Sequence, residues 1–381
     1  MKEKLLRSFS YLLVAFAAAV LTLAVTQRRG PDSKLEELEA LIDQRFIGEA
    51  QMDELRDAAA EAMVKATGDR WSYYIPADEY ESYSERMANA YVGIGITIQP
   101  EEGEGYLILS VTPGSPAEES GILPGDLLVE VEGQKVAQLD SEAVRALVRG
   151  EEGTTVSLRV MRMGDVLGKN VERRKVKTQV ATYEMLENNI GYVKIANFDT
   201  RCAQETIAAI DSLVAAGAEK LIFDVRNNPG GYAHELVDVL DYLLPEGDLF
   251  RSLSYDGKET VDTSDPDCLG LPMAVLVNGS SYSAAEFFAA AIQEYDAGVV
   301  VGEKTTGKGY FQTTIRMSDG SAVALSVGKY FTPQGVSLAD TGVTPDILSP
   351  VDEETAQSIY SNTLPTPQDP QIQSALRALE E

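Results

Sequence analysis

The stretch MAVLVNGSSYSAAEFF (273–288) changes from apolar β-formers to small polar residues and then to a helical pattern. It predicts a strand that ends in a tight turn and continues as a helix, with Ser283 at the helix start. A hydroxyl there lies beside the amide of Ala284, where a helix N-terminus stabilises developing negative charge. This unit indicates an α/β core and makes Ser283 a candidate nucleophile.

Strands and helices alternate on both sides of this stretch. Strands are expected at 191–197, 221–226 and 298–302. Helices are expected at 203–216, in the segment that follows the second of these strands and ends at 244, and in the segment that begins at 283. A hairpin turns at 318–320. This alternation predicts a sheet with helices covering its faces.

A serine nucleophile needs a base, and the whole chain contains one histidine, His234. The stretch GEKTTGKGYFQ (302–312) places Lys308 between two glycines, 25 residues after Ser283. A lysine whose burial favours its neutral form can serve as the base, and Gln312 could orient its amine. A lysine in a glycine turn is more often a solvated loop residue, so this pair alone decides little.

Two glycines after the strand at 221–226 are candidates for the second half of an oxyanion hole. Gly230 and Gly231 would let the backbone approach a substrate carbonyl closely, with the amide of Ala284 as the other donor. They could equally form only a turn before a helix. Ser280 and Ser281 are rival nucleophiles by position.

Short β-branched strands separated by glycine turns occupy residues 91–163. The segments GSPA (114–117) and GILPGD (121–126) resemble those of PDZ domains. The loop Gly93, Ile94, Gly95 could point its amides at a peptide's terminal carboxylate, and the strand from Ile96 could accept the peptide as an added strand. The alternative is that these glycines only make a tight turn.

Composition limits the partners. The 381 residues are 44% hydrophobic and 24% charged, as in folded proteins of more than one domain. With 60 acidic against 32 basic residues, the net charge of −28 makes nucleic acid a poor partner. Cys202 and Cys268 with a single histidine cannot form a zinc site. The sequence leaves a disulfide and two free thiols equally open.

Residues 1–29 combine a basic start, an apolar run from Phe9 to Val25 and two following arginines. The run is short for a bilayer span, and no small-residue cleavage site follows it. We expect an uncleaved membrane anchor, with a signal peptide as the alternative, and the basic start places the body outside the cytoplasm. Ser33 and Glu36 then form a capping box that begins a helix.

In their order, these motifs resemble the carboxyl-terminal processing peptidases, tail-specific serine proteases with an embedded PDZ domain. The resemblance covers about residues 68–350 and rests on SYSAAE (281–286), GKG (307–309), RNNPGG (226–231) and the segments 318–321, 329–333 and 342–346. It implies Ser283 as nucleophile, Lys308 as base and Gln312 as assistant. It also implies an oxyanion hole from Ala284 with Gly230 or Gly231, and no cofactor or metal. Tyr282 and Ala285 depart from the family's usual Ala and Ser.

The expected fold is an α/β peptidase core with an inserted mainly-β PDZ domain and helical N-terminal and C-terminal segments. The expected parts are an anchor or signal peptide (1–29), a helical region and start of the core (30–90), the PDZ domain (91–163), the peptidase core (164–350) and a tail with a short helix (351–381).

The implied function is a serine endopeptidase that cleaves extracytoplasmic proteins near their C-termini. Its partners would be proteins or peptides with a free C-terminus, captured or gated by the PDZ domain, and the membrane through residues 1–29. The terminal helices at 33–46 and 372–379 are candidate contacts for a homo-oligomer.

Three alternatives are open to test. The segment 302–308 matches a phosphate-binding loop, but Gly309 stands where a hydroxyl should hold Mg²⁺. A hydrolase based on His234 is the second, with a polar residue at a helix start as its simpler explanation. A non-catalytic PDZ adaptor on a peptidase fold is the third; it would predict loss of Ser283, Lys308 or Gln312, and all three are present.

Overall fold

The computed structural model describes residues 33–101 and 103–380. The expected anchor at 1–29 lies outside these residues. In the described part of the chain, no helix is long and apolar enough to cross a bilayer. The chain divides into two units, with the boundary after Tyr74.

The described residues of the first unit, from Ser33 on, form two helices, α2 (Lys34–Arg45) and α3 (Met52–Lys65). Ser33 is the N-cap of α2 and accepts a hydrogen bond from Glu36 N–H, as the sequence predicted. Arg56 of α3 forms an ion pair with Glu39 of α2. The chain then passes through β1 (Tyr73–Ile75).

The second unit begins with α4 (Tyr80–Met87) and an inserted, mainly β region. Its elements are β2 (Ala90–Gly93), β3 (Ile96–Glu101), β4 (Gly105–Val111), α5 (Pro116–Glu119), β5 (Leu127–Val131), β6 (Gln134–Lys135), α6 (Ser141–Val148), β7 (Thr155–Arg162), β8 (Asp165–Glu172) and β9 (Arg174–Lys177). The main path of its sheet runs β3-β4-β5-β7-β8. β8 pairs with β7 along its whole length, so the inserted sheet continues past residue 163, where the sequence led us to expect the end of the PDZ domain.

This inserted region has its own apolar core. Isoleucine, leucine and valine side chains from its strands, from α6 and from the connection after β2 are fully or nearly fully buried together, among them Ile94, Ile108, Leu128, Val144 and Val160. Alternate residues of β7 point inward, as expected for a strand with one covered face. The region is therefore packed around a core of its own.

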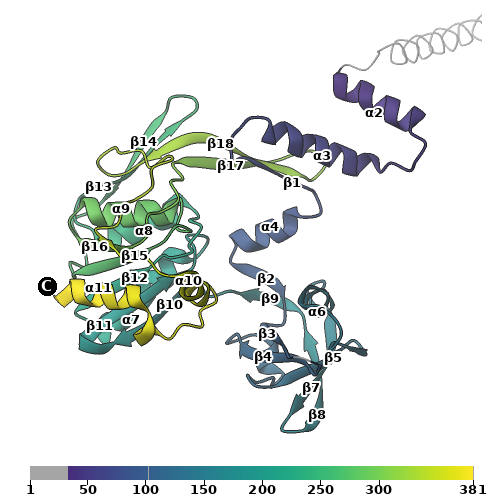
Figure 1. The fold of residues 1–381 in the computed structure, drawn as a ribbon, viewed down its shortest axis with the longest axis horizontal. Helices are drawn as coiled ribbons and strands as arrows, with labels where there is room; N and C mark the ends of the chain where they lie inside the picture. Colours follow the sequence, from purple (N-terminus) through teal and green to yellow (C-terminus); the bar gives the residue numbers. More distant parts are fainter. Residues whose placement is uncertain (1–32, 102, 381) are drawn as a thin grey trace, which may run out of the picture. The chain divides into compact units, whose positions relative to one another are not determined.

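The rest of the unit is an α/β core. Its elements are β10 (Ala181–Leu186), η1 (Glu187–Asn189), β11 (Ile190–Ile195), α7 (Cys202–Ala215), β12 (Lys220–Asp224), α8 (Ala233–Leu243), β13 (Gly247–Ser254), β14 (Glu259–Ser264), β15 (Met273–Val277), α9 (Ala284–Glu294), β16 (Gly298–Gly302), β17 (Tyr310–Arg316), β18 (Ala322–Phe331), β19 (Ile347–Leu348), α10 (Glu353–Tyr360), η2 (Thr366–Gln368) and α11 (Pro370–Glu380). Figure 1 labels most of them.

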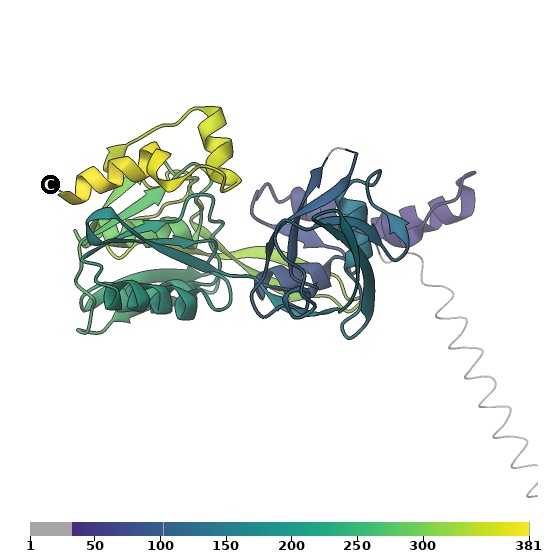
Figure 2. The same ribbon diagram turned by 90° about the horizontal axis from the view of Figure 1, so that it is seen from below.

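The central sheet has the order β10-β11-β12-β15-β16-β19. β10 is antiparallel to β11, and the other neighbours are parallel. Side chains on one face, such as Phe223 and Val275, pack with α7, α8 and α9. Side chains on the other face, such as Ile222 and Ala274, pack with α11. In Figure 2 the yellow α11 lies on one side of the sheet and the teal helices on the other.

The predicted fold class is confirmed: an α/β core with covered sheet faces carries an inserted mainly-β region. The β13–β14 hairpin was not expected from the sequence, and it pairs through β13 with β18. The two cysteines are both free, with Cys202 buried and Cys268 exposed. Burial raises the pKa of the Cys202 thiol.

Candidate active site

Three loops follow neighbouring parallel strands of the central sheet. β12 pairs with β15, and β15 pairs with β16. The segments that follow these strands contain Gly230, Ser283 and Lys308, respectively. Since the carboxyl ends of neighbouring parallel strands lie together, the fold gathers the three predicted segments at one edge, the usual place for a site in an open α/β sheet.

Ser283 is the N-cap of α9 and is buried, with 6% of its surface exposed. Its backbone has φ 58° and ψ −127°, a conformation that residues with a side chain rarely adopt. Strained backbone of this kind is found at active sites, and a sharp strand-to-helix turn can present a nucleophilic hydroxyl. The predicted strand–turn–helix unit is present around Ser283.

Hydrogen bonds fix the turn before Ser283 to the loop after β12. Tyr282 N–H donates to Asn228 O at 3.1 Å. Asn227 and Asn278 bond each other reciprocally: Asn227 N–H donates to Asn278 Oδ1 at 3.0 Å, and Asn278 Nδ2 donates to Asn227 Oδ1 at 2.9 Å. The two loops therefore form one connected structure.

The rival serines differ from Ser283 in their surroundings. Ser281 is fully buried, and its hydroxyl donates to Val225 O at 2.7 Å, which commits it to the backbone. Ser280 is exposed, and its N–H donates to Asn278 Oδ1 at 3.1 Å. These contacts give Ser281 a structural role in the turn.

The buried carboxylate of Glu286 joins the serine loop to the lysine loop. Its Oε2 accepts hydrogen bonds from Ser283 N–H at 3.0 Å and from Lys308 N–H at 2.8 Å. Its Oε1 accepts from Gly307 N–H at 2.7 Å and from the Thr305 hydroxyl. The amide nitrogens of Ser283 and Lys308 thus bond the same oxygen atom, so the two residues are neighbours.

Lys308 is half-buried, and its Nζ lies 5.7 Å from the centroid of the Tyr282 ring. Gly307, with φ +87°, and Gly309 on either side pack closely against the segment 339–342. A Cβ on Gly309 would lie 2.6 Å from Ala339 N, so a side chain there would displace the loop. The flanking glycines allow this close approach, which holds the backbone of Lys308.

Gln312 lies on β17, and its side chain is half-buried. Its Nε2 donates to Tyr310 O at 3.2 Å and to Ser326 Oγ at 3.0 Å. The hairpin of β17 and β18 therefore holds the amide nitrogen. A hydrogen bond between Gln312 and the amine of Lys308 would therefore use the amide oxygen of Gln312 as the acceptor.

The glycine pair after β12 lies directly against the nucleophile. Gly230 has φ +86°, and a Cβ on it would lie 2.7 Å from Ser283 Cβ and 2.8 Å from Ala284 N. Its N–H donates to Asn228 Oδ1 at 2.8 Å and its carbonyl accepts from Phe198 N–H. Because the peptide is trans, the N–H of Gly231 points away from Phe198. The Gly230 amide is therefore engaged by Asn228, whereas the Gly231 amide faces away from Phe198.

Ala284 is the other oxyanion donor that the sequence led us to expect. It is the first residue of α9, so its N–H has no acceptor within the helix. This amide and the glycine turn flank the same serine.

His234 lies at the protein surface, whereas Ser283 and Glu286 are buried. Its side chain is 70% exposed, and its ring stacks on Tyr232 with centroids 5.3 Å apart. Its ring nitrogen lies 3.9 Å from the carboxylate of Glu235. These contacts match those of a surface residue near a helix start.

Asp199, which sequence reasoning missed, is a buried carboxyl beside the glycine turn. A Cβ on Gly231 would lie 2.6 Å from Asp199 N. Burial and then the nearby charge of Glu235 raise the pKa of Asp199 to about 7. Burial and then the charge of Asp199 also raise the pKa of Tyr282. No local sequence pattern identifies this residue, because its environment comes from segments distant in the chain.

Glu286 was also missed as a functional residue, although its position follows a readable pattern. Ser283 and Glu286 have the S-x-x-E spacing of a capping box, and the Glu286 carboxylate accepts from Ser283 N–H as in such a box. Its second role, accepting from Thr305, Gly307 and Lys308, depends on tertiary structure.

In the inserted region, Gly93 ends β2, and Ile94 and Gly95 connect it to the edge strand β3, which begins at Ile96. The carbonyls of Ile94 and Gly95 accept from Ala117 N–H and Thr112 N–H at 2.9 Å each. In trans peptides the N–H groups of Gly95 and Ile96 therefore point away from those partners. This geometry is compatible with binding a terminal carboxylate.

Comparisons with known proteins agree with this architecture. Residues 189–349 match the family model "Peptidase family S41", and residues 107–162 match "PDZ domain". The carboxy-terminal processing protease CtpA of Bacillus subtilis strain 168 is 32% identical over 362 residues, covering 91% of this chain and 78% of that protein. The chain belongs to the C-terminal processing serine proteases of family S41.

Further relatives of this S41 protease chain are similar over most of its length. A probable CtpA-like serine protease of Staphylococcus saprophyticus is 30% identical, covering 90% of this chain and 69% of that one. The crystal structure of a putative S41 protease from Bacteroides fragilis covers 93% of this chain and 98% of its own, with a TM-score of 0.57 and 17% identity. This last match supports the fold alone.

Proposed function

We propose that this S41 protease is a serine endopeptidase of the C-terminal processing type, with Ser283 as nucleophile and Lys308 as base. The observation that carries the proposal is the shared oxygen of Glu286, which accepts from the amides of both residues. The strained backbone of Ser283 and the close approach of Gly230 add to it. The family supplies the reaction class.

In the proposed reaction, the neutral amine of Lys308 takes the proton of the Ser283 hydroxyl as its oxygen bonds the scissile carbonyl carbon. The carbon–nitrogen bond then breaks, and the lysine gives that proton to the leaving amine. Water then gives a proton to the same lysine as its oxygen bonds the acyl carbon, the bond from that carbon to Ser283 Oγ breaks, and the lysine returns the proton to the serine. Gln312 would accept a hydrogen bond from the lysine through its amide oxygen.

The oxyanion would bind the N–H groups of Ala284 and of the Gly230–Gly231 turn. We favour Gly231 over Gly230 as the second donor because Gly230 N–H already bonds Asn228. Amides fixed in advance stabilise the transition state without reorganising during the reaction.

The PDZ domain would recognise the substrate's C-terminal residues and deliver the chain or gate the site. The edge position of β3 and the outward amides of Gly95 and Ile96 support this role. Substrates would be extracytoplasmic proteins with free C-termini, and residues 1–29 would anchor the enzyme. The terminal helices remain our candidates for a homo-oligomer contact.

The test uses the full chain and a partly unfolded protein substrate. Ser283→Ala and Lys308→Ala should each lower kcat by more than about a thousandfold, and Gln312→Ala by less. Ser280→Ala, a neighbouring hydroxyl removed in the same way, should cleave like the parent.

Full activity of Ser283→Ala would overturn the proposal. Loss of activity only in His234→Ala would establish the histidine alternative. A parent chain that binds tagged substrates but cleaves none of them would support a PDZ adaptor.

A further inference from the structure

Arg226 opens the turn that contains Gly230, yet its side chain is 2% exposed and points away into the protein. Its Nε donates to Asp224 Oδ1 at 2.9 Å, and its Nη2 donates to Asp224 Oδ2 at 2.6 Å. Such a two-point pairing fixes the plane of the guanidinium as well as its position. Asp224 also accepts from the Tyr192 hydroxyl at 2.6 Å.

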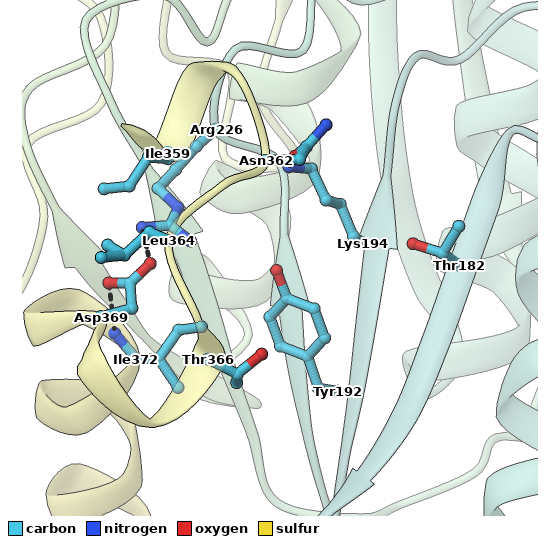
Figure 3. Close-up of a pocket in the computed structure, with 10 residues that line it drawn as sticks. All are labelled: Thr182, Tyr192, Lys194, Arg226, Ile359, Asn362, Leu364, Thr366, Asp369 and Ile372. Carbon is cyan, nitrogen blue, oxygen red and sulfur yellow. Dashed lines mark hydrogen bonds and ion pairs between the residues drawn. The ribbon is translucent and has the colours of Figure 1, made fainter. Parts of the chain in front are cut away.

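The third side of the guanidinium is held by the C-terminal segment. Arg226 Nη1 lies 2.8 Å from Asp369 Oδ2 and donates to Gln371 Oε1 at 2.9 Å. Figure 3 shows Arg226 and Asp369 joined beside a pocket of about 350 Å³ that Arg226 lines. On that side the guanidinium therefore bonds two polar side chains of the C-terminal segment.

Asp369 is itself held in place. Its Oδ1 accepts from Gln371 N–H at 2.9 Å and from Ile372 N–H at 3.2 Å, so it caps the start of α11. Gln371 Nε2 donates to Ser349 O at 2.7 Å. Since α11 packs on the sheet through Ile372, Ala375 and Leu379, the helix gives Arg226 a rigid support.

The backbone on both sides of Arg226 supports the nucleophile turn. Val225 O accepts the hydroxyl of Ser281, and Asn227 bonds Asn278. A shift of Arg226 would therefore move atoms to which the turn before Ser283 is bonded. A misplacement of about 1 Å in a catalytic group can cost about a hundredfold in rate.

The ion network formed by Arg226, Asp224 and Asp369 is buried. Asp224 is fully buried and Asp369 is 4% exposed in their side chains. Burial acts to raise the pKa of Asp224, but the Arg226 guanidinium outweighs it and keeps that pKa below its ordinary value. The network holds one positive and two negative groups, so removing the Asp369 charge leaves Arg226 paired with Asp224 but takes the carboxylate partner from Nη1.

From these contacts we infer that Asp369, with Gln371, is a positioning residue for catalysis, acting through Arg226 on the turn that supports Ser283. The C-terminal segment is thereby part of the catalytic machinery although it touches no reacting atom. This inference rests on the proposed role of Ser283.

The experiment compares Asp369→Asn with Asp352→Asn in the full chain. Both substitutions neutralise an aspartate that caps a helix of the C-terminal segment, but Asp352 caps α10 and is exposed. We expect Asp369→Asn to lower kcat by about tenfold with KM within about twofold of the parent. The rate at which a fluorophosphonate labels Ser283 should fall by a similar factor. Asp369→Glu, which keeps the charge, should recover part of the loss.

Thermal unfolding, measured on every variant, separates position from stability. If Asp369→Asn only lowers the melting temperature, while kcat and labelling of the folded protein match Asp352→Asn, the inference is wrong. If Asp369→Asn does not fold, Gln371→Met tests the same contact without a charge change. We then expect a smaller loss of kcat, and an unchanged kcat would overturn the inference.

Ser283→Ala controls the premise. If Ser283→Ala stays active, the proposed function fails. If Ser283→Ala is inactive while Asp369→Asn is fully active, this inference alone is rejected.

Discussion

The carboxyl edge of the central sheet and the inserted PDZ domain use buried polar groups in different ways. At the edge, Asn228, Ser281 and Glu286 are fully buried and bond backbone groups of separate loops. In the PDZ domain the core is made almost entirely of aliphatic side chains. One of its few buried charges, Asp126, pairs with Arg162.

The difference shows how each region is specified. Buried polar atoms require partners at fixed distances, so the carboxyl edge of the central sheet has one permitted geometry, as a catalytic site needs. An aliphatic core tolerates small shifts more easily, and the PDZ domain has an edge strand, β3, that can accept a ligand strand. We therefore expect changes at the edge to act on kcat and changes in PDZ recognition to act on KM.

Gly230→Ala should have the largest effect of the four changes considered next. The new Cβ would lie within 3 Å of Ser283 Cβ, Ala284 N and Tyr282 O, at a φ of +86°. We expect kcat to fall by more than about a hundredfold because the nucleophile turn must move. The control is Gly335→Ala, which has φ +81° with no heavy atom within 4 Å of its Cβ. Equal kcat in the two variants would contradict the close packing of Gly230 on Ser283.

Glu286→Gln should lower kcat by about tenfold to a hundredfold. The amide keeps one acceptor oxygen but places an NH₂ group against two of the four donors that now bond the carboxylate. Steady-state kinetics and the rate of fluorophosphonate labelling measure the loss. The matched control is Glu294→Gln at the other end of α9. A normal labelling rate in Glu286→Gln would show that the carboxylate does not position the two loops.

A substrate with an amidated C-terminus should test the PDZ side of the comparison without altering the protein. Removing the carboxylate charge should raise KM by about tenfold and leave kcat close to its original value, because amides at the 93–96 loop would lose their anionic partner. Equal KM for free and amidated substrates would remove carboxylate capture from the proposed mechanism. A change confined to kcat would indicate gating instead.

Asp199→Asn should have the smallest effect of the four changes, and this effect is on stability rather than on catalysis. Burial, with the charge of Glu235, raises its pKa from an ordinary 3.8 to about 7 in the folded chain. Between about pH 4 and pH 7 the unfolded chain loses the proton that the folded chain keeps, so this group makes the protein less stable as the pH rises through that window. Asp199→Asn should raise the melting temperature at pH 8 by about 2–4 °C and have less effect at pH 4.

The control for this change is Asp238→Asn, which removes an exposed charge on α8. Scanning calorimetry at both pH values measures the two variants against the parent. A stabilisation by Asp199→Asn that is equal at pH 4 and pH 8 would be inconsistent with a raised pKa.

Much of the fold could be predicted from local patterns. The strand Gly298–Gly302 has the predicted bounds, and the strand Met273–Val277 with the helix that starts after Ser283 forms the predicted strand–turn–helix unit. Their signals are local: apolar runs, capping residues and glycine punctuation. The hairpin of β13 and β14 was missed because its strands mix polar and apolar residues, and its pairing with β18 is a long-range contact.

The candidate site divides in the same way. The strand–turn–helix unit of Ser283, the glycines around Lys308 and the family resemblance can be read from the sequence, because they depend on residues close together in the chain. Three contacts need the folded chain: Glu286 joins the two loops, Gly230 packs against Ser283, and Asp369 holds Arg226. Those contacts depend on which strands become neighbours, which is set by the packing of the whole sheet rather than by any local pattern.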